Sequence, residues 1–132
     1  MSATDPDIAA LHRYFLWADV MRVRFHEQLK TTPKWEEAMM FPYMSYWYAG
    51  TYALIEGWLE LKLSDRQIDG LLQSPNVELL KRYRNGAFHF QKQYFDSRFL
   101  DFMGGEDSAK WIAQLQEAFS QWFLEYFKKR ES

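Results

Sequence analysis

The sequence predicts a single all-α domain, a bundle of four to five helices, and three observations support this prediction. Apolar residues recur every three or four positions along most of the chain, which is the periodicity of an amphipathic helix. No segment alternates apolar and polar residues as a strand does over a useful length. No repeat, low-complexity tract or long linker interrupts the chain. We therefore expect residues 1–132 to form one bundle around one core.

The first predicted helix begins at Asp5 and ends at the segment Thr31-Thr32-Pro33. Asp5 is a suitable cap, and Pro6 suits the first helical position because its missing N–H is not needed there. The apolar face of this helix consists of Ile8, Leu11, Phe15, Ala18, Phe25 and Leu29.

A second helical region is expected over residues 35–63, split or kinked at Pro42. The part that follows the proline is apolar nearly all round, as in a helix that is buried on several sides. Two interpretations fit this pattern: it is the central helix of the bundle, or it faces a partner subunit. Because its apolar faces exceed what one small bundle covers, we expect a homodimer.

Shorter helices are predicted in the middle of the chain. The segment Ser64-Asp65-Arg66-Gln67 is a capping box for a short helix that ends near Leu72. Ser74-Pro75 begins a further helix, which we expect to fray or bend near Gly86. Its apolar face consists of Val77, Leu80, Tyr83 and Phe88.

Two more helices are predicted in the last third of the chain. A short one over residues 95–103 is closed by Gly104-Gly105. The last, over residues 107–129, has the clearest apolar stripe and ends in Lys128-Lys129-Arg130, where the negative helix end favours cations. The stripe consists of Trp111, Ile112, Leu115, Ala118, Phe119, Trp122, Phe123, Tyr126 and Phe127.

Composition and missing motifs exclude several classes of function. The N-terminus is acidic and lacks an apolar signal segment, and no apolar run is long enough to span a membrane, so we expect a cytoplasmic protein. The formal net charge is −2, so binding of nucleic acid would need a local basic patch. The chain has no cysteine, no phosphate-binding glycine loop and no Glu-x-x-His pair, so neither a metal nor a cofactor is expected.

The segment Arg84-Asn85-Gly86-Ala87-Phe88-His89 carries most of the functional signal. Arginine offers a fixed fork of donors to phosphate oxygens, and histidine transfers protons near neutral pH. Asn85 and His89 are four residues apart and share a helix face, whereas Arg84 lies roughly 140° from His89 on an ideal helix. A local basic patch is predicted from four nearby cations, namely Lys81, Arg82, Lys92 and Arg98.

Structural alternatives exist for each of these residues. A helical arginine often pairs with a carboxylate, and a histidine can be a satisfied core residue. Glu56 lies in the apolar helix and needs a partner if it is buried; it either pairs with some arginine, lies in water at an edge, or orients Arg84 or His89. The aromatic run over residues 43–52 is explained by core or dimer packing, or by stacking on nucleic-acid bases.

The chain resembles the HEPN domain family. The segment 84–89 fits that family's pattern of an arginine and a histidine separated by four to six residues, late in a small helical bundle. The aromatic-rich segment Tyr46-Trp47-Tyr48-Ala49-Gly50-Thr51-Tyr52-Ala53-Leu54-Ile55-Glu56-Gly57-Trp58 is also similar to uncharacterised bacterial relatives. The resemblance implies a HEPN-like bundle that dimerises, with two Arg–His motifs in one cleft. Many members are metal-independent endoribonucleases that act as toxins or in phage defence.

The resemblance also implies roles for individual residues. Arg84 would bind the scissile phosphate, His89 would transfer a proton during attack by the RNA 2′-hydroxyl, and Asn85 would hold His89 or the phosphate. Some toxins of the family carry a tyrosine two residues after the histidine, which a nucleotidyltransferase antitoxin modifies. This chain has Gln91 there, which argues against that partner.

Two other classes of function stay open. Some HEPN-like proteins have lost activity and serve as RNA-binding, nucleotide-binding or interaction modules. Alternatively, the aromatic side chains form a pocket for a small apolar ligand.

Overall fold

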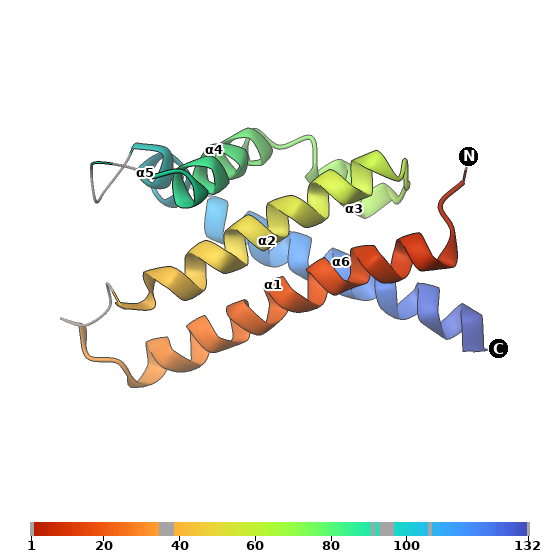
Figure 1. The fold of residues 1–132 in the computed structure, drawn as a ribbon, viewed down its shortest axis with the longest axis horizontal. Helices are drawn as coiled ribbons and strands as arrows, with labels where there is room; N and C mark the ends of the chain where they lie inside the picture. The colour runs from red at the N-terminus through yellow and green to blue at the C-terminus, as the bar shows by residue number, and fades with distance from the viewer. Residues whose placement is uncertain (1, 35–38, 91, 93–96, 106, 132) are drawn as a thin grey trace.

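The computed structural model describes residues 2–34, 39–90, 92, 97–105 and 107–131, and their regular secondary structure is entirely helical. Four longer helices and two short ones follow one another along the chain (Figure 1): α1 (Asp5–Thr31), α2 (Phe41–Glu60), α3 (Arg66–Leu71), α4 (Asn76–Phe88), α5 (Ser97–Met103) and α6 (Ser108–Glu131). The all-α prediction is confirmed, with one helix more than the upper limit of the expected range. None of the described helices combines the length and apolar character needed to cross a bilayer.

Helix α1 begins at Asp5, as the sequence predicts, but its cap is the residue before. Thr4, not Asp5, is the cap: its side chain accepts a hydrogen bond from the Asp7 backbone N–H. The Asp7 carboxylate in turn accepts from the Thr4 backbone N–H, which completes a capping box. The helix ends at Thr31, as the sequence predicts.

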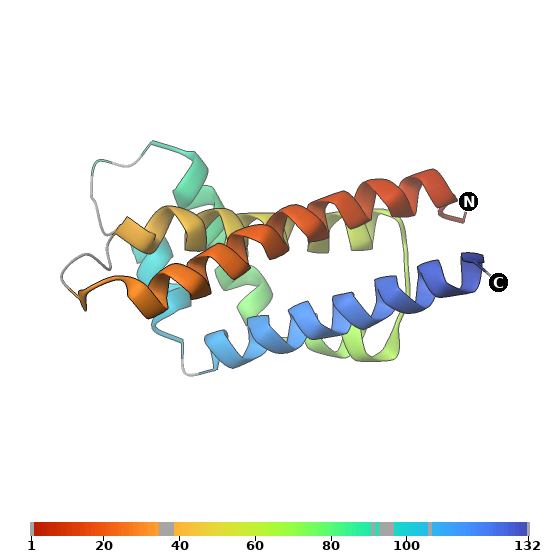
Figure 2. The same ribbon diagram turned by 90° about the horizontal axis from the view of Figure 1, so that it is seen from below.

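Helix α2 begins at Phe41, so Pro42 lies in its first turn and does not kink it. A proline is tolerated there because the first N–H groups of a helix have no partner within the helix. Of the predicted region 35–63, residues 35–38 lie outside the described residues, and the helix ends at Glu60 with Leu61 as its cap. Helix α2 is the central helix of the bundle, with α1 alongside it, α4 above it in Figure 1 and α6 behind it (Figures 1 and 2).

Helices α1 and α2 run antiparallel and approach closely at small residues. A Cβ atom added at Gly50 would lie 3.1 Å from the Ala18 Cβ, and one added at Gly57 would lie 2.5 Å from the Leu11 Cδ1. Gly50 therefore sets how closely the two helices approach, whereas Gly57 makes room for the Leu11 side chain. The core stripe of α1 packs along this contact and consists of Ile8, Leu11, Phe15 and Ala18.

Helices α3 and α4 differ from the prediction in two respects. Asp65, not Ser64, caps α3, because its side chain accepts from the Ile68 backbone N–H. Helix α4 continues without a break past Gly86, which is buried: an added Cβ would lie 3.1 Å from the Phe99 ring. The glycine admits the α5 aromatic ring and does not bend the helix.

Helix α6 carries the apolar stripe that the sequence predicts and brings the two ends of the chain together. Trp58 of α2 packs against Phe119 and Trp122 of this stripe. Near its end, Tyr126 and Arg130 both donate hydrogen bonds to the Asp5 carboxylate at the start of α1. The termini consequently lie at one end of the molecule in both views (Figures 1 and 2).

The glycine contact predicts the effect of two substitutions. Gly50→Val should lower the free energy of unfolding by about 1–3 kcal/mol, because the added atoms overpack against the α1 backbone and Ala18. Gly70→Ala is the matched control: nothing lies within 4 Å of its added Cβ, so helix propensity should raise stability by about 0.5–1 kcal/mol. Urea unfolding followed by circular dichroism measures both, and an unchanged midpoint for Gly50→Val would contradict the close approach.

Candidate functional site

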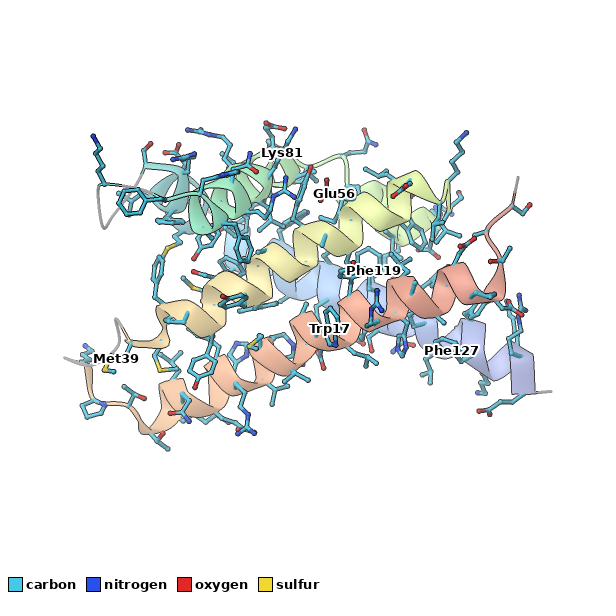
Figure 3. The ribbon with its side chains drawn as sticks, viewed as in Figure 1. Trp17, Met39, Glu56, Lys81, Phe119 and Phe127 are labelled. Atoms are coloured by element: carbon cyan, nitrogen blue, oxygen red, sulfur yellow. The ribbon has the colours of Figure 1, made fainter. Side chains whose placement is uncertain are left out.

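Arg84 of α4 is held by side chains from two helices. Its Nη1 donates a 2.9 Å hydrogen bond to the Glu56 Oε1 of α2, and its guanidinium carbon lies 4.8 Å from the ring centroid of Tyr52. The Arg84 side chain is 28% exposed and that of Glu56 is 49% exposed, so solvent reaches the pair. In Figure 3, Glu56 lies between α2 and α4, and Lys81 points outward from α4.

Asn85 fixes the same guanidinium from within α4. Its side-chain oxygen accepts a 3.1 Å hydrogen bond from the Arg84 Nε. The Asn85 backbone carbonyl accepts from the His89 N–H, an ordinary contact at a helix end. Because Glu56 and Asn85 bind Nη1 and Nε, the Arg84 Nη2 lies outside both contacts. The Tyr52 ring lies against the guanidinium. Burial is the main cause that raises the pKa of Tyr52, and the charge of Glu56 is the second, so the tyrosine stays neutral.

His89 does not share a helix face with Asn85, which corrects the prediction. Helix α4 ends at Phe88, and His89 is its C-terminal cap with an extended backbone, φ −116° and ψ 135°. His89 is exposed. The arginine and the histidine therefore belong to one end of α4, the first on its surface and the second just beyond its last turn.

The four predicted RNA-binding cations are not gathered on one face. Arg82 forms a 2.8 Å ion pair with Asp101 of α5, on a different side of α4 from Arg84. Lys81 is exposed and lies three residues before Arg84, so these two share a flank. Lys92 is exposed, Arg98 is half-buried at the start of α5, and Gln91 lies outside the described residues.

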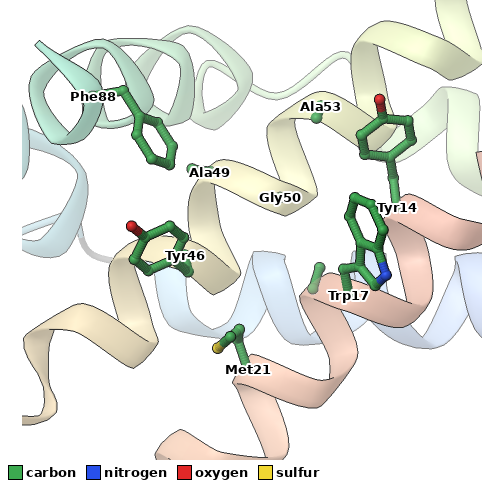
Figure 4. Close-up of a pocket in the computed structure, with 9 residues that line it drawn as sticks. Tyr14, Trp17, Met21, Tyr46, Ala49, Gly50, Ala53 and Phe88 are labelled. Carbon is green, nitrogen blue, oxygen red and sulfur yellow. The ribbon is translucent and has the colours of Figure 1, made fainter.

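Aromatic side chains form a groove between α1 and α2 (Figure 4), whereas the sequence indicates such a pocket only as an open alternative and does not locate it. Its volume is about 370 Å³, and its lining is almost entirely apolar. The floor is made of small residues of both helices, namely Ala18, Ala49, Gly50 and Ala53. The walls are larger side chains, namely Tyr14, Trp17, Met21, Tyr46 and Phe88. We call this the aromatic groove.

The wall side chains of the aromatic groove are unusually exposed for their size. Trp17 is 58% exposed, Tyr46 55% and Phe88 53%. The aromatic run over residues 43–52 thus divides in two. Its core members are Trp47, Tyr48 and Tyr52. Tyr46 instead lines the groove, and its ring centroid lies 5.5 Å from that of Phe88.

The aromatic groove adjoins the Arg84 cluster, which consists of Arg84, Glu56, Asn85 and Tyr52. Phe88 is one helical turn after Arg84 on α4, and Glu56 is about one turn after Ala53 on α2. A sequence signal for the groove exists in hindsight: Tyr14, Trp17 and Met21 repeat at helical spacing beside the core stripe of α1. That signal does not distinguish a groove wall from an extension of the core.

Neither a metal-binding cluster nor a known relative assigns a function to this site. Within the described residues, no three His, Asp or Glu side chains gather where a metal ion would bind. The chain matches no protein-family model, no curated protein and no solved structure.

The exposure of the Arg84 cluster predicts that it contributes little to stability. Arg84→Lys and Glu56→Gln should each lower the free energy of unfolding by at most about 1 kcal/mol, because a solvent-screened ion pair contributes no more than that. Tyr83→Ala, which empties a fully buried aromatic site on the same helix, should lower it by about 3–5 kcal/mol. A loss for Arg84→Lys close to that of Tyr83→Ala in urea unfolding would show that Arg84 is structural.

Proposed function

We propose that this chain is a HEPN-like domain that binds single-stranded RNA and cleaves it without a metal ion. The observation that supports this best is the Arg84 cluster. Glu56, Asn85 and Tyr52 hold the guanidinium in place, Nη2 lies outside the two hydrogen bonds, and His89 is exposed at the end of the same helix. The resemblance extends the proposal to a bacterial toxin or phage-defence protein in the cytoplasm.

In this proposal Arg84 binds the scissile phosphate through Nη2, the nitrogen outside the contacts to Glu56 and Asn85. Holding the guanidinium in advance reduces the reorganisation needed when charge develops on the phosphate oxygens. Glu56 opposes part of the positive charge, so it acts as a positioning residue and also weakens the attraction for the anion.

His89 supplies proton transfer in the same proposal. It accepts the proton of the RNA 2′-hydroxyl while that oxygen attacks the adjacent phosphorus atom. The P–O bond to the next nucleotide breaks, and the 5′-oxygen leaves and takes up a proton. The products are a 2′,3′-cyclic phosphate end and a 5′-hydroxyl end, with no change in oxidation state.

A second candidate function is favoured by the aromatic groove. A volume of about 370 Å³ with apolar walls falls in the range of small-ligand sites. In this alternative the domain binds an apolar ligand or serves as an interaction module, and Arg84 only closes one side of the groove.

The proposal predicts RNA cleavage that survives a chelator. Labelled single-stranded RNA incubated with the protein and EDTA should yield fragments with cyclic phosphate ends. His89→Ala should lower the cleavage rate by about 10²–10⁴, the usual contribution of a proton-transfer group. Arg84→Lys should also lower it strongly, because an ammonium cannot be held by Asn85 and Glu56 at two nitrogens while a third nitrogen faces the phosphate.

Matched control variants are available on α1. Arg22→Lys alters an arginine that is 27% exposed and ion-paired with Asp19, and His26→Ala removes another exposed histidine. Both controls should cleave at the wild-type rate. Wild-type protein that cleaves no RNA, or equal cleavage by wild type, His89→Ala and Arg84→Lys, would disprove the proposed activity.

The proposal also includes a homodimer in which the α4 ends of two subunits face each other. The apolar faces of α2 do not support a dimer, because most apolar residues of this helix are buried within the subunit. The support that remains is local: Phe90, just after His89, is 91% exposed. Light scattering at micromolar concentration should report a dimer, and Phe90→Asp should shift it toward monomer. A monomeric wild type would contradict the two-subunit cleft.

A further inference from the structure

We propose that the aromatic groove binds the bases of single-stranded RNA while Arg84 and Arg13 at its rims bind the phosphates. This inference rests on the proposed function, because it names how the same site recognises its substrate. Its first support is the shape of the groove. Flat aromatic walls stand around a floor of alanine and glycine, so a planar ring can reach the floor without displacing a side chain (Figure 4).

The exposed ring faces suit stacking on bases. Trp17 and Tyr46 come from different helices and lie on opposite sides of the groove (Figure 4). Every base has a π-face, so aromatic platforms of this kind bind single strands with little sequence preference. Because the groove is open to solvent, the polar edges of a stacked base stay hydrated, and the apolar lining imposes no desolvation penalty on them.

Cations occupy both rims of the groove. On α1, the Arg13 guanidinium carbon lies 5.4 Å from the ring centroid of Tyr14 and 5.1 Å from that of Trp17. On α4, Arg84 is one turn before Phe88, a separation of about 5–6 Å between Cβ atoms. Arg13 and Arg84 therefore flank the aromatic walls on two sides. A nucleic-acid strand whose bases point into the groove needs phosphate-binding groups at these positions.

Of the two carboxylates nearby on α2, one offsets part of the positive charge of Arg84 and the other lies outside the groove. Glu56 is paired with Arg84. Glu60 is seven residues beyond Ala53 on α2, about 10 Å along the helix and thus outside the groove. An amphipathic helix from a partner protein would also cover the apolar walls, but it gives the two flanking arginines no role. The two arginines favour a polyanionic ligand, and the aromatic walls favour one that carries planar rings.

The test compares normal and abasic oligonucleotides. Wild-type protein is titrated with a short fluorescent 2′-O-methyl oligouridylate, which cannot be cleaved through the 2′-oxygen, and with the same backbone lacking bases. Trp17→Ala should weaken binding of the first about tenfold, within the range measured for base–aromatic stacking, and leave binding of the second unchanged. Arg84→Lys should weaken both, and raising the salt concentration should weaken both in wild type.

Two further variants guard against misfolding and nonspecific effects. Ala53→Leu fills the floor of the groove and keeps every aromatic side chain, so it should weaken binding of the oligouridylate as Trp17→Ala does. Leu124→Ala removes an exposed apolar side chain on α6 that is outside the groove and should change nothing. Circular dichroism confirms that each variant is folded.

The outcomes separate this inference from the proposed function. If wild type binds both oligomers equally and neither groove variant changes binding, the base-binding role is wrong and phosphate binding at Arg84 stands. If wild type binds neither oligomer, both proposals fail. Anilinonaphthalene sulfonate is a fluorescent dye that binds apolar surfaces. If wild type binds this dye but no RNA, and Ala53→Leu abolishes the dye binding, the groove is a site for apolar ligands.

Discussion

Helix α2 is apolar on nearly every side, and the bundle is arranged so that other helices cover it. Large side chains on three of its faces are buried by α1, by α4 with α5, and by α6, with Trp58 and Ile55 completely enclosed. On the remaining flank α2 carries Tyr46 followed by three small residues, Ala49, Gly50 and Ala53. Small side chains allow α1 to approach closely but cannot fill the space above the contact. The aromatic groove is thus a direct result of how α2 is covered.

Some of the core aromatic side chains also carry polar atoms that form hydrogen bonds, among them Trp58 and Tyr83. The Trp58 indole N–H donates to Asp69 at 3.0 Å, and this contact, more than any other, lowers the pKa of that carboxyl. The Tyr83 hydroxyl contacts Ser45 at 2.9 Å, and burial raises the pKa of Tyr83 to about 12. Buried hydrogen bonds of this kind fix how α2 meets α3 and α4 and therefore hold the Tyr52 and Glu56 platform below Arg84.

The fold was more predictable from the sequence than the site, for physical reasons. Periodicity locates helices because burial follows it, but it does not distinguish a cap from its neighbour, as Thr4 and Asp5 show. Gly86 indicated a bend because glycine is flexible, whereas here it makes room for Phe99. Glu56 was expected either to pair with an arginine or to orient Arg84, and the observed ion pair fits both. The groove depends on two helices at once, which no single stretch of sequence reveals.

The hydrogen bonds from Tyr126 and Arg130 to Asp5 have a consequence for how this domain can be joined to others. A chain that enters and leaves a domain at neighbouring points can be inserted into a surface loop of a host protein with little loss in loop closure entropy. The same geometry allows the ends to be linked and new ends opened elsewhere, for instance in the turn between α2 and α3. Such rearranged chains would keep the groove and the Arg84 cluster intact, since both lie away from the joined ends.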